Sequence, residues 1–142
     1  MITHFSEVEF STPSCIGVVQ IYHELLGLPL AYQDDNRVTL DLCPHTQIHF
    51  VRKQQPHSPF HIAFTVSASD YAAAKKFVES KLPTCGETNP DRKYRHYFRD
   101  GDGNILELNA ERQFKADAIT PYSPLGIMFL KEVGFVLRDF PG

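Results

Sequence analysis

The stretch that decides the fold is Arg99-Asp-Gly-Asp-Gly-Asn-Ile-Leu-Glu-Leu108, in which a turn runs into a strand. Residues 100–104, Asp-Gly-Asp-Gly-Asn, have the composition of a turn, because glycine supplies positive φ and Asp and Asn hydrogen-bond their own backbone. The runs on either side, Tyr94–Arg99 and Ile105–Asn109, therefore predict the two strands of a hairpin.

The second strand of this hairpin carries a carboxylate between two leucines. Leu106 and Leu108 point to one face of the strand, and Glu107 points to the other. A carboxylate in a short apolar strand is costly to bury unless it is paired or binds a metal. Glu107 is therefore either a candidate metal ligand or a surface residue on a wet face, and the strand alone does not decide between the two.

Composition and charge limit the functional classes. A chain of 142 residues is one domain, or two small modules that share a core. The net charge of −3 gives no reason to expect a nucleic acid or an anionic membrane as a partner. No apolar run approaches the length of a membrane span, and the N-terminus lacks the features of a signal peptide. The three scattered cysteines (Cys15, Cys43, Cys85) predict no disulfide framework, and we expect a cytoplasmic protein.

The first half of the chain reads as strand, helix and three strands. Pro13-Ser14 is expected to open the helix and Gly27 to end it, with Ile16 in its apolar stripe. The expected strands of this half are Phe5–Thr12, Leu28–Gln33, residues 38–42 and Gln47–Val51.

The same order returns in the second half. A strand at Phe60–Val66 is followed by a helix that Ser69-Asp70 is expected to cap and whose apolar stripe includes Phe77. A loop at Pro83–Asp91 with a short strand leads into the closing hairpin.

An internal repeat explains this order. Residues 36–50 align without a gap on residues 94–108 at an offset of 58, and residues 7–10 align on residues 61–64 at an offset of 54. The alignment places four side chains that can bind metals at two equivalent positions of the repeat: Glu7, His49, His61 and Glu107.

Strand alternation places these four side chains on one face. Because Ile62 and Phe64 must cover the helix, His61 points to the opposite, concave face of its strand. By the same parity the other three members of the set lie on that face. His4 has the wrong parity and is a second choice. We expect the other histidines to be surface or packing residues: His23, His45, His57 and His96.

A duplicated βαβββ module with these residues resembles the vicinal oxygen chelate superfamily, which includes glyoxalase I, extradiol dioxygenases and the fosfomycin- and bleomycin-resistance proteins. The segment Tyr22–Leu28 is similar to the family's first-helix signature, and residues 61–64 are similar to the first strand of its second module. Residues 97–108 are similar to its closing hairpin, with Gly101 where proline is usual. The resemblance covers about residues 4–112. It implies an α+β fold of two tandem βαβββ modules that form a cupped mixed sheet with helices on the outer face.

The expected domain organisation has three parts. The first module spans 1–55, the second spans 56–114, and 115–142 is a linker plus an isolated strand that resembles the start of a third module. In that strand, Glu132-Val-Gly-Phe135 copies the opening segments of both modules. We expect 129–138 to form a β-strand, to pair with a sheet edge and to help form a homodimer, with exchange between chains as one route. A disordered tail is the alternative.

The resemblance also implies a divalent metal on the concave face, held by the first and last strands of each module. Carried onto this chain, the metal ligands are Glu7, His49, His61 and Glu107. Their tips are expected within about 5 Å of one centre, and two carboxylates with two imidazoles suit Zn, Ni, Mn or Fe(II). Glu7 stands where a histidine is common and His49 where a carboxylate is common.

The function that this resemblance favours is a metal-dependent lyase, isomerase or dioxygenase. The metal would polarise adjacent oxygens of a small, oxygen-rich substrate, and Glu107 or Glu7 would move a proton. Arginine forks match carboxylate or phosphate, so the expected substrate-binding residues are Arg37, Arg95, Tyr97 and Thr39. Solvated edge arginines are the alternative for that pair. The alternative function is a metal-free binding or resistance protein of the bleomycin-binding type, whose cup holds an apolar or cationic molecule.

Overall fold

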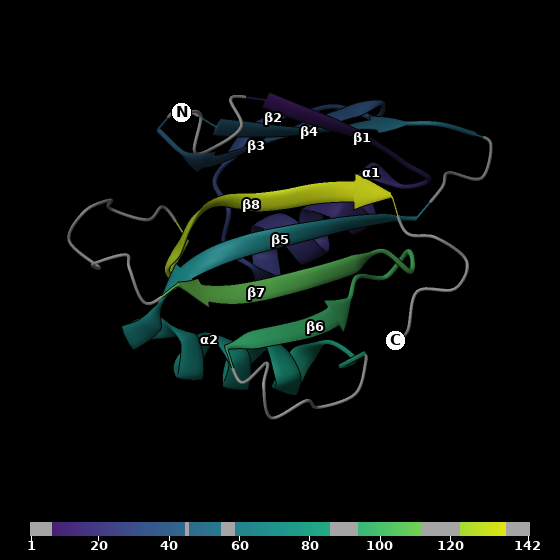
Figure 1. Cartoon of the computed structure of the whole chain (residues 1–142). Helices are drawn as coiled ribbons and strands as arrows, with labels where there is room; N and C mark the ends of the chain where they lie inside the picture. Colours follow the sequence, from purple (N-terminus) through teal and green to yellow (C-terminus); the bar gives the residue numbers. More distant parts are fainter. Residues whose placement is uncertain (1–6, 45, 55–58, 86–93, 112–122, 136–142) are drawn as a thin grey trace.

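The computed structural model describes residues 7–44, 46–54, 59–85, 94–111 and 123–135 (Figure 1). The elements of the first half are β1 (Glu7–Thr12), α1 (Cys15–Val18), η1 (Val19–Leu25), β2 (Leu30–Gln33), β3 (Arg37–Cys43) and β4 (Thr46–Arg52). Those of the second half are β5 (Phe60–Ser67), α2 (Ala68–Lys81), β6 (Arg95–Arg99), β7 (Ile105–Glu111) and β8 (Ile127–Phe135). They form two four-stranded sheets with the strand orders β1-β4-β3-β2 and β6-β7-β5-β8. The predicted α+β class is confirmed.

The helix of the first half begins and ends where the sequence predicts. The hydroxyl of Ser14 accepts a hydrogen bond from the backbone N–H of Gly17 at 3.0 Å, which caps α1. Its continuation, η1, is a π-helix that ends at Leu25, and Gly27, two residues later, turns the chain away with a φ of +77°. Ile16 was expected in the buried stripe but is 67% exposed, because Cys15 and Val18 form the buried face instead.

The second helix, α2, begins two residues earlier than predicted. Its cap is Ser67, whose hydroxyl accepts from the N–H of Asp70 at 3.3 Å and donates to the Asp70 carboxylate at 2.7 Å. Asp70 is therefore the third residue of the helix, and the expectation of a cap at Ser69-Asp70 was wrong. Phe77 also departs from its expected place, since it is 38% exposed. The buried face of α2 consists of Tyr71, Ala74 and Val78.

The internal repeat reappears in the strand register. The first strand of each half pairs in parallel with the last, and the last pairs antiparallel with the strand before it. Equivalent rows across the two sheets contain Glu9, His49 and Thr39 in the first and Ala63, Glu107 and Tyr97 in the second. These rows differ by the offsets of 54 and 58 found in the sequence. An isolated bridge between Thr84 and Phe98 stands where β2 pairs with β3 in the first half.

One hydrophobic core joins the two halves. The ring of Phe10 stacks on that of Phe60 with 4.3 Å between centroids, and Phe50 lies 6.0 Å from Phe60. Aromatic rings from the first sheet thus pack directly on the start of β5, and burial of this area stabilises both halves together. No helix in the described ranges is long and apolar enough to cross a membrane.

The turn at residues 100–104 ties the closing hairpin to the rest of the core. One carboxylate oxygen of Asp100 accepts from the backbone N–H groups of Asp102 and Asn104 at 2.9 and 3.0 Å. The other accepts from the Tyr22 hydroxyl at 2.7 Å and from the Asn104 side-chain amide at 2.8 Å. The Asn104 side-chain oxygen in turn accepts from the N–H of Phe60 at 3.1 Å. The predicted turn therefore also positions η1 and the start of β5.

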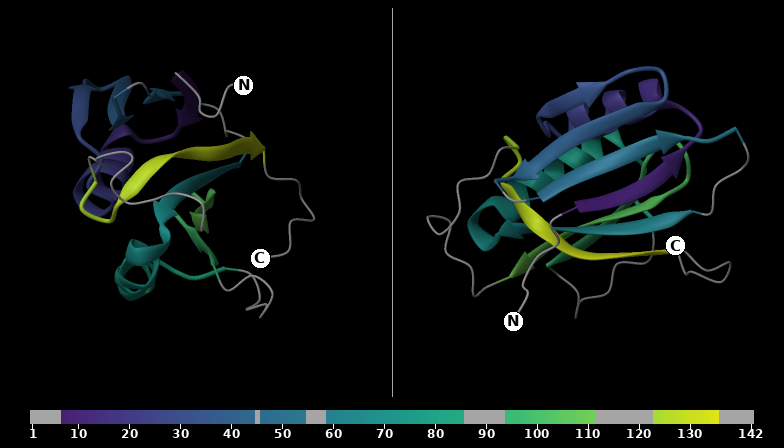
Figure 2. Two further views of the ribbon diagram at one scale, coloured as in Figure 1. Left: turned by 60° about the vertical axis from the view of Figure 1, so that its left-hand side comes forward. Right: turned by 90° about the horizontal axis from the view of Figure 1, so that it is seen from above.

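The C-terminal strand pairs with the edge of β5, as expected. β8 runs antiparallel to β5 from Phe135 opposite Phe60 to Ile127 opposite Val66. The views in Figures 1 and 2 show β8, in yellow, alongside β5 and next to the first sheet. Ile127 and Leu130 are fully buried, so β8 belongs to the shared core. Residues 136–138 of the expected strand lie outside the described residues.

A tight turn before β8 lies between the two helices. The Ser123 hydroxyl donates to the backbone carbonyl of Leu26 at 2.6 Å, at the end of η1. Gly126 has a φ of +83°, and a Cβ there would lie 2.6 Å from a carboxylate oxygen of Asp70 at the start of α2. The turn thus requires glycine at this position, and it fixes the point where β8 begins.

Candidate functional site

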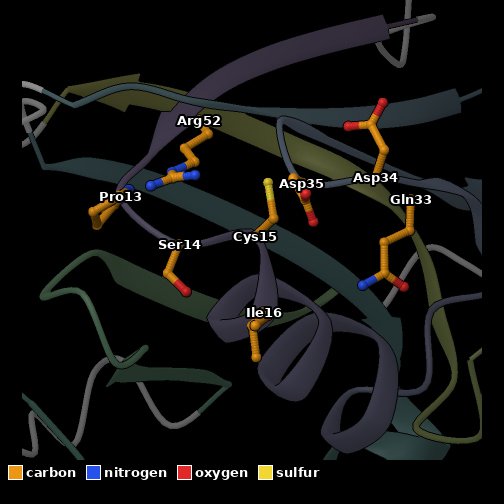
Figure 3. Close-up of a pocket in the computed structure, with 8 residues that line it drawn as sticks. All are labelled: Pro13, Ser14, Cys15, Ile16, Gln33, Asp34, Asp35 and Arg52. Atoms are coloured by element: carbon orange, nitrogen blue, oxygen red, sulfur yellow. The ribbon is translucent and has the colours of Figure 1, made fainter.

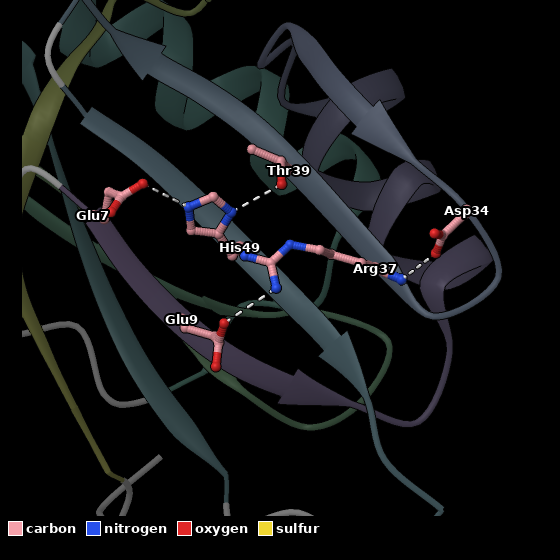
Figure 4. A network of polar contacts seen from close by, with 6 residues as sticks. All are labelled: Glu7, Glu9, Asp34, Arg37, Thr39 and His49. Carbon is pink, nitrogen blue, oxygen red and sulfur yellow. Dashed lines mark hydrogen bonds and ion pairs between the residues drawn. The ribbon is translucent and has the colours of Figure 1, made fainter.

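The first pair of expected ligands lies on the first sheet (Figure 4). Nε2 of His49 on β4 lies 3.2 Å from a carboxylate oxygen of Glu7 on β1. Nδ1 of the same ring lies 2.8 Å from the hydroxyl of Thr39 on β3. The side chain of Glu7 is 67% exposed, whereas that of His49 is 12% exposed. The imidazole is therefore held in one orientation, while the carboxylate lies mostly in solvent.

The second pair lies on the second sheet, and its carboxylate is far more deeply buried than that of the first pair. Nε2 of His61 on β5 lies 3.2 Å from one carboxylate oxygen of Glu107 on β7. The other oxygen accepts a hydrogen bond from the side-chain amide of Asn109 at 2.8 Å. The side chain of Glu107 is 4% exposed. The interpretation of Glu107 as a surface residue on a wet face is therefore wrong.

Opposing effects act on the pKa of Glu107. Burial raises this pKa, because desolvation disfavours the charged form. The hydrogen bonds from His61 and Asn109 lower it, and the charges of His61 and Arg95 lower it further. These effects together exceed that of burial, so the pKa of Glu107 lies below its ordinary value. Glu107 is consequently ionised at neutral pH.

The two pairs are related by the internal repeat, with the residue types exchanged. The position on the first strand carries a carboxylate in the first sheet (Glu7) and an imidazole in the second (His61). The position on the last strand carries the imidazole of His49 and the carboxylate of Glu107. The nitrogen–oxygen distance is 3.2 Å in both pairs. Each sheet thus presents one imidazole and one carboxylate in the same arrangement.

The two pairs do not meet within one chain. Among the described residues, no three His, Cys, Asp or Glu side chains come together as a group that could hold a metal. The expectation that all four tips surround one centre is therefore not met in the single chain. The physical reason is the strand order: β5 has β7 on one side and β8 on the other, so the first sheet cannot join its edge.

Comparison with known proteins finds solved structures of similar architecture. No family model and no curated protein matches the sequence. Among solved structures, the integron cassette protein HFX_CASS4 from the Halifax Harbour sewage outfall has a TM-score of 0.65, with 23% identity over 78% of this chain and all of its own. Lactoylglutathione lyase from Agrobacterium tumefaciens has a TM-score of 0.64, with 16% identity over 77% of this chain and 94% of its own. A glyoxalase/bleomycin resistance protein/dioxygenase from Alicyclobacillus acidocaldarius has a TM-score of 0.58, with 16% identity over 75% of this chain and 89% of its own.

The chain shares the fold of these structures, which is the fold expected from the resemblance to the vicinal oxygen chelate superfamily. Both carboxylate–imidazole pairs lie at the strand positions where the resemblance to this superfamily places ligands. The donor chemistry of each pair suits half of a four-ligand set for a divalent metal. In the first pair, the bond from Nδ1 of His49 to Thr39 leaves Nε2 directed at Glu7. A metal-binding histidine is oriented in the same way, by a bond from its second ring nitrogen.

The expected substrate-binding residues differ in their contacts. Arg37 lies 3.4 Å from the exposed carboxylate of Glu9 (Figure 4), and Thr39 already bonds to His49. On the second sheet the ring of Tyr97 lies 6.2 Å from that of His61. Arg95 is exposed, and its charge contributes to the lowered pKa of Glu107.

Asn109 is a site residue that the sequence analysis missed. It is 3% exposed and bonds to Glu107 through its amide. The signal for it was present, since Asn109 follows Glu107 by two residues and therefore shares its strand face. Its register partner Thr65 is also fully buried, and the Thr65 hydroxyl has no hydrogen-bond partner in the described part of the chain.

A separate polar pocket lies at the start of α1 (Figure 3). It has a volume of about 270 Å³ and is lined by Pro13, Ser14, Cys15, Ile16, Gln33, Asp34, Asp35 and Arg52. Burial raises the pKa of the Cys15 thiol, and the charge of Asp34 adds to this effect. Cys15 is therefore a protonated thiol at neutral pH, which is a poor nucleophile. None of the expected site residues lines this pocket.

Proposed function

We propose that this protein is a divalent-metal-dependent enzyme of the glyoxalase-like type, acting as a lyase or isomerase on a small, oxygen-rich substrate. The observation that carries the proposal is the pair of equivalent carboxylate–imidazole contacts on the two sheets, both at 3.2 Å. If these contacts had arisen by chance, the same contact would not be expected at equivalent positions of both halves. The recurrence supports a shared role for the four side chains Glu7, His49, His61 and Glu107.

Two copies of the chain would complete such a site. Each pair provides two ligands, and within one chain the pairs do not come together. In a twofold homodimer, the first sheet of each protomer would face the second sheet of its partner, which gives two equivalent contacts. Each of the two resulting sites then contains one pair from each protomer. β1 is an edge strand of the first sheet in the described part of the chain, which leaves that side of the first pair accessible.

The metal, when bound, would supply Lewis-acid polarisation of two neighbouring substrate oxygens. Glu107 is held at both carboxylate oxygens, so its role is that of a fixed anionic ligand. Glu7 makes one contact and is 67% exposed, so it has the freedom to move a proton between substrate atoms. Arg95 and Tyr97 would orient an anionic group of the substrate, a role supported by the contact of Tyr97 with His61 and by the effect of the Arg95 charge on Glu107.

The experiment is metal analysis of protein purified without an affinity tag, combined with its mass in solution. We expect a dimer with about one divalent ion per chain, because each site takes two pairs of ligands. His61→Asn and Glu7→Gln should each lower the metal content, whereas Glu79→Gln, an exposed carboxylate on α2, should leave it unchanged. A metal-free dimer that takes up no Zn, Ni, Mn or Fe(II) would reject the proposal.

A metal-free binding protein is the second candidate function. The observation in its favour is that protein donors already satisfy both carboxylate oxygens of Glu107. Such a protein would use the face around His61 and Tyr97 to hold an apolar or cationic molecule. The same metal analysis separates the two candidates, because only the first requires metal that is lost with His61 or Glu7.

A further inference from the structure

A second, larger groove lies on the helical side of the molecule. It has a volume of about 430 Å³, which is within the range of small-molecule sites. It lies between the end of η1, one face of α2 and the turn before β8. Its lining residues are Glu24, Leu25, Leu26, Gly27, Asp70, Ala73, Ala74, Phe77, Pro124 and Leu125. None of the carboxylate–imidazole pairs borders it.

The walls of the groove are apolar and its charges are of one sign. Glu24 and Asp70 are the charged side chains of the lining, and no lysine, arginine or histidine is among the described residues that line it. Neither carboxylate has an ion-pair partner in the described part of the chain. The C-terminal end of η1 adds the partial negative charge of its backbone carbonyls. Within the described ranges, the lining thus contains no cationic side chain to balance these carboxylates.

Small side chains and a partly exposed ring shape the interior. Ala73 leaves space where a larger residue would fill it. Gly27 is covered by Pro124 instead, since a Cβ at position 27 would lie 2.4 Å from the proline ring. Phe77 is 38% exposed at this groove, although it lies one residue from the buried face of α2. An aromatic face beside carboxylates attracts a cation through the ring quadrupole as well as through charge.

We propose that this groove binds an organic cation with an apolar body, such as an aromatic or branched alkyl ammonium. The apolar body would fill the space between Ala73, Phe77 and Leu125, with the cationic group directed at Glu24. Asp70 contributes negative charge while keeping its bond to Ser67. The inference does not depend on metal binding, since it uses none of the residues of the proposed function.

The groove also connects three parts of the chain that the fold brings together. Its walls come from the first half, from α2 and from the turn that starts β8. A ligand that contacts all three stabilises the folded state by mass action, since the unfolded chain does not assemble the groove. Binding should therefore raise the melting temperature as well as perturb local resonances.

The test is an NMR titration of the whole protein with phenyltrimethylammonium, its neutral isostere tert-butylbenzene and the anion benzenesulfonate. We expect the cation to shift the amide resonances of Gly27, Ala73 and Leu125 in a saturable way. The isostere should bind more weakly, the anion should not bind, and added salt should weaken binding of the cation. Equal binding of the cation and the isostere would overturn the assignment of charge, and no saturable shift with the cation would overturn the site.

Three variants locate the binding. Ala73→Leu places a bulkier side chain at an exposed helix position and should weaken binding about tenfold or more. Glu24→Gln should weaken binding of the cation about two- to fivefold, as expected for one exposed charge contact, without affecting the isostere. Glu79→Gln on the same helix is the matched control and should change nothing. Unchanged binding in Ala73→Leu, with the fold intact by its amide spectrum, would reject the groove.

Discussion

Glu107 lies 3.2 Å from His61 across β5 and β7, and the contact copies that of Glu7 with His49 across β1 and β4. The two contacts share geometry and differ in environment. The side chain of Glu107 is 4% exposed and that of Glu7 is 67% exposed. The carboxylate of the pair is therefore buried on one sheet and solvated on the other, whereas both imidazoles are largely buried, and this difference can be measured.

Neutralising the two carboxylates should have unequal effects on stability. We expect Glu107→Gln to lower the free energy of unfolding by about 1–3 kcal/mol, because it disrupts a buried hydrogen-bonded group. Glu7→Gln should change it by about 0.5 kcal/mol or less, as is usual for an exposed ion pair. Urea denaturation of both variants measures the difference. Equal losses would contradict the burial of the second pair.

Asn109→Ala should destabilise the protein through Glu107. The substitution removes the donor to one buried carboxylate oxygen, and an unsatisfied buried acceptor costs about 1–3 kcal/mol. Gln47→Ala is the matched control, since Gln47 makes a similar amide–carboxylate bond to Asp41 at a half-exposed position. Chemical denaturation should show the smaller loss for the control. If the control loses as much, Asn109 has no special part in holding Glu107.

β8 should be required for the stability of the shared core. Leu130 is fully buried, so Leu130→Ala should lower the free energy of unfolding by about 2–5 kcal/mol. Ile16→Ala removes a residue of similar size that is 67% exposed and should cost about 0.5 kcal/mol or less. Thermal and urea unfolding of the two variants provide the comparison. A near-wild-type Leu130→Ala protein would show that β8 does not pack as described.

Gly126→Ala should be more damaging than Gly103→Ala. Both residues have φ near +80°, so both variants carry the backbone strain of about 1–2 kcal/mol. A Cβ at position 103 meets no atom within 4 Å, whereas one at position 126 meets the Asp70 carboxylate at 2.6 Å. Melting temperatures should therefore fall further for position 126. The reverse order would rule out the close approach of the turn to α2.

Stability should fall in mild acid because of His96. This side chain is 4% exposed, and its Nε2 has no hydrogen-bond partner in the described part of the chain. Burial lowers the pKa of His96 below 6.5; the charge of Glu79 raises this pKa and that of Lys75 lowers it, but burial is the largest effect. The unfolded chain then binds the proton more readily, so stability is complete above about pH 6.5 and is lost as pH falls toward the folded pKa. His96→Phe should remove this part of the pH dependence between pH 7.5 and 5. An unchanged slope would exclude His96 as its source.

The sequence predicted the fold well because its main signal is local and repeated. The offsets of 54 and 58 relate the two halves residue for residue, and the register of β5 with β7 repeats that of β1 with β4 by the same offsets. The hairpin followed from the turn at residues 100–104, where side chains and backbone agree on one conformation. The turn and each repeated segment are short runs of consecutive residues, so they can be recognised without knowing how the sheets pack.

The site was predicted only in part because its assembly depends on distant contacts. Parity placed the four side chains on one face of their strands, and the structure joins them as two carboxylate–imidazole pairs. The separation of the pairs depends on β8, which follows β5 by about sixty residues and takes its free edge. The cap at Ser67 was missed for a simpler reason, since Ser69 and Asp70 also favour a helix start and only the backbone geometry decides among them.

The position of β8 has a consequence for the order of events during synthesis. Phe60 pairs with Phe135, which the ribosome adds 75 residues later. At 5–20 residues per second, the edge of β5 waits about 4 to 15 s for its partner. During that interval the strand Phe60–Ser67 offers open backbone groups and apolar side chains to any neighbouring nascent chain. The yield of folded protein should therefore depend on translation rate and expression level, and slower expression at low temperature should favour the pairing of β8 with β5 within the same chain.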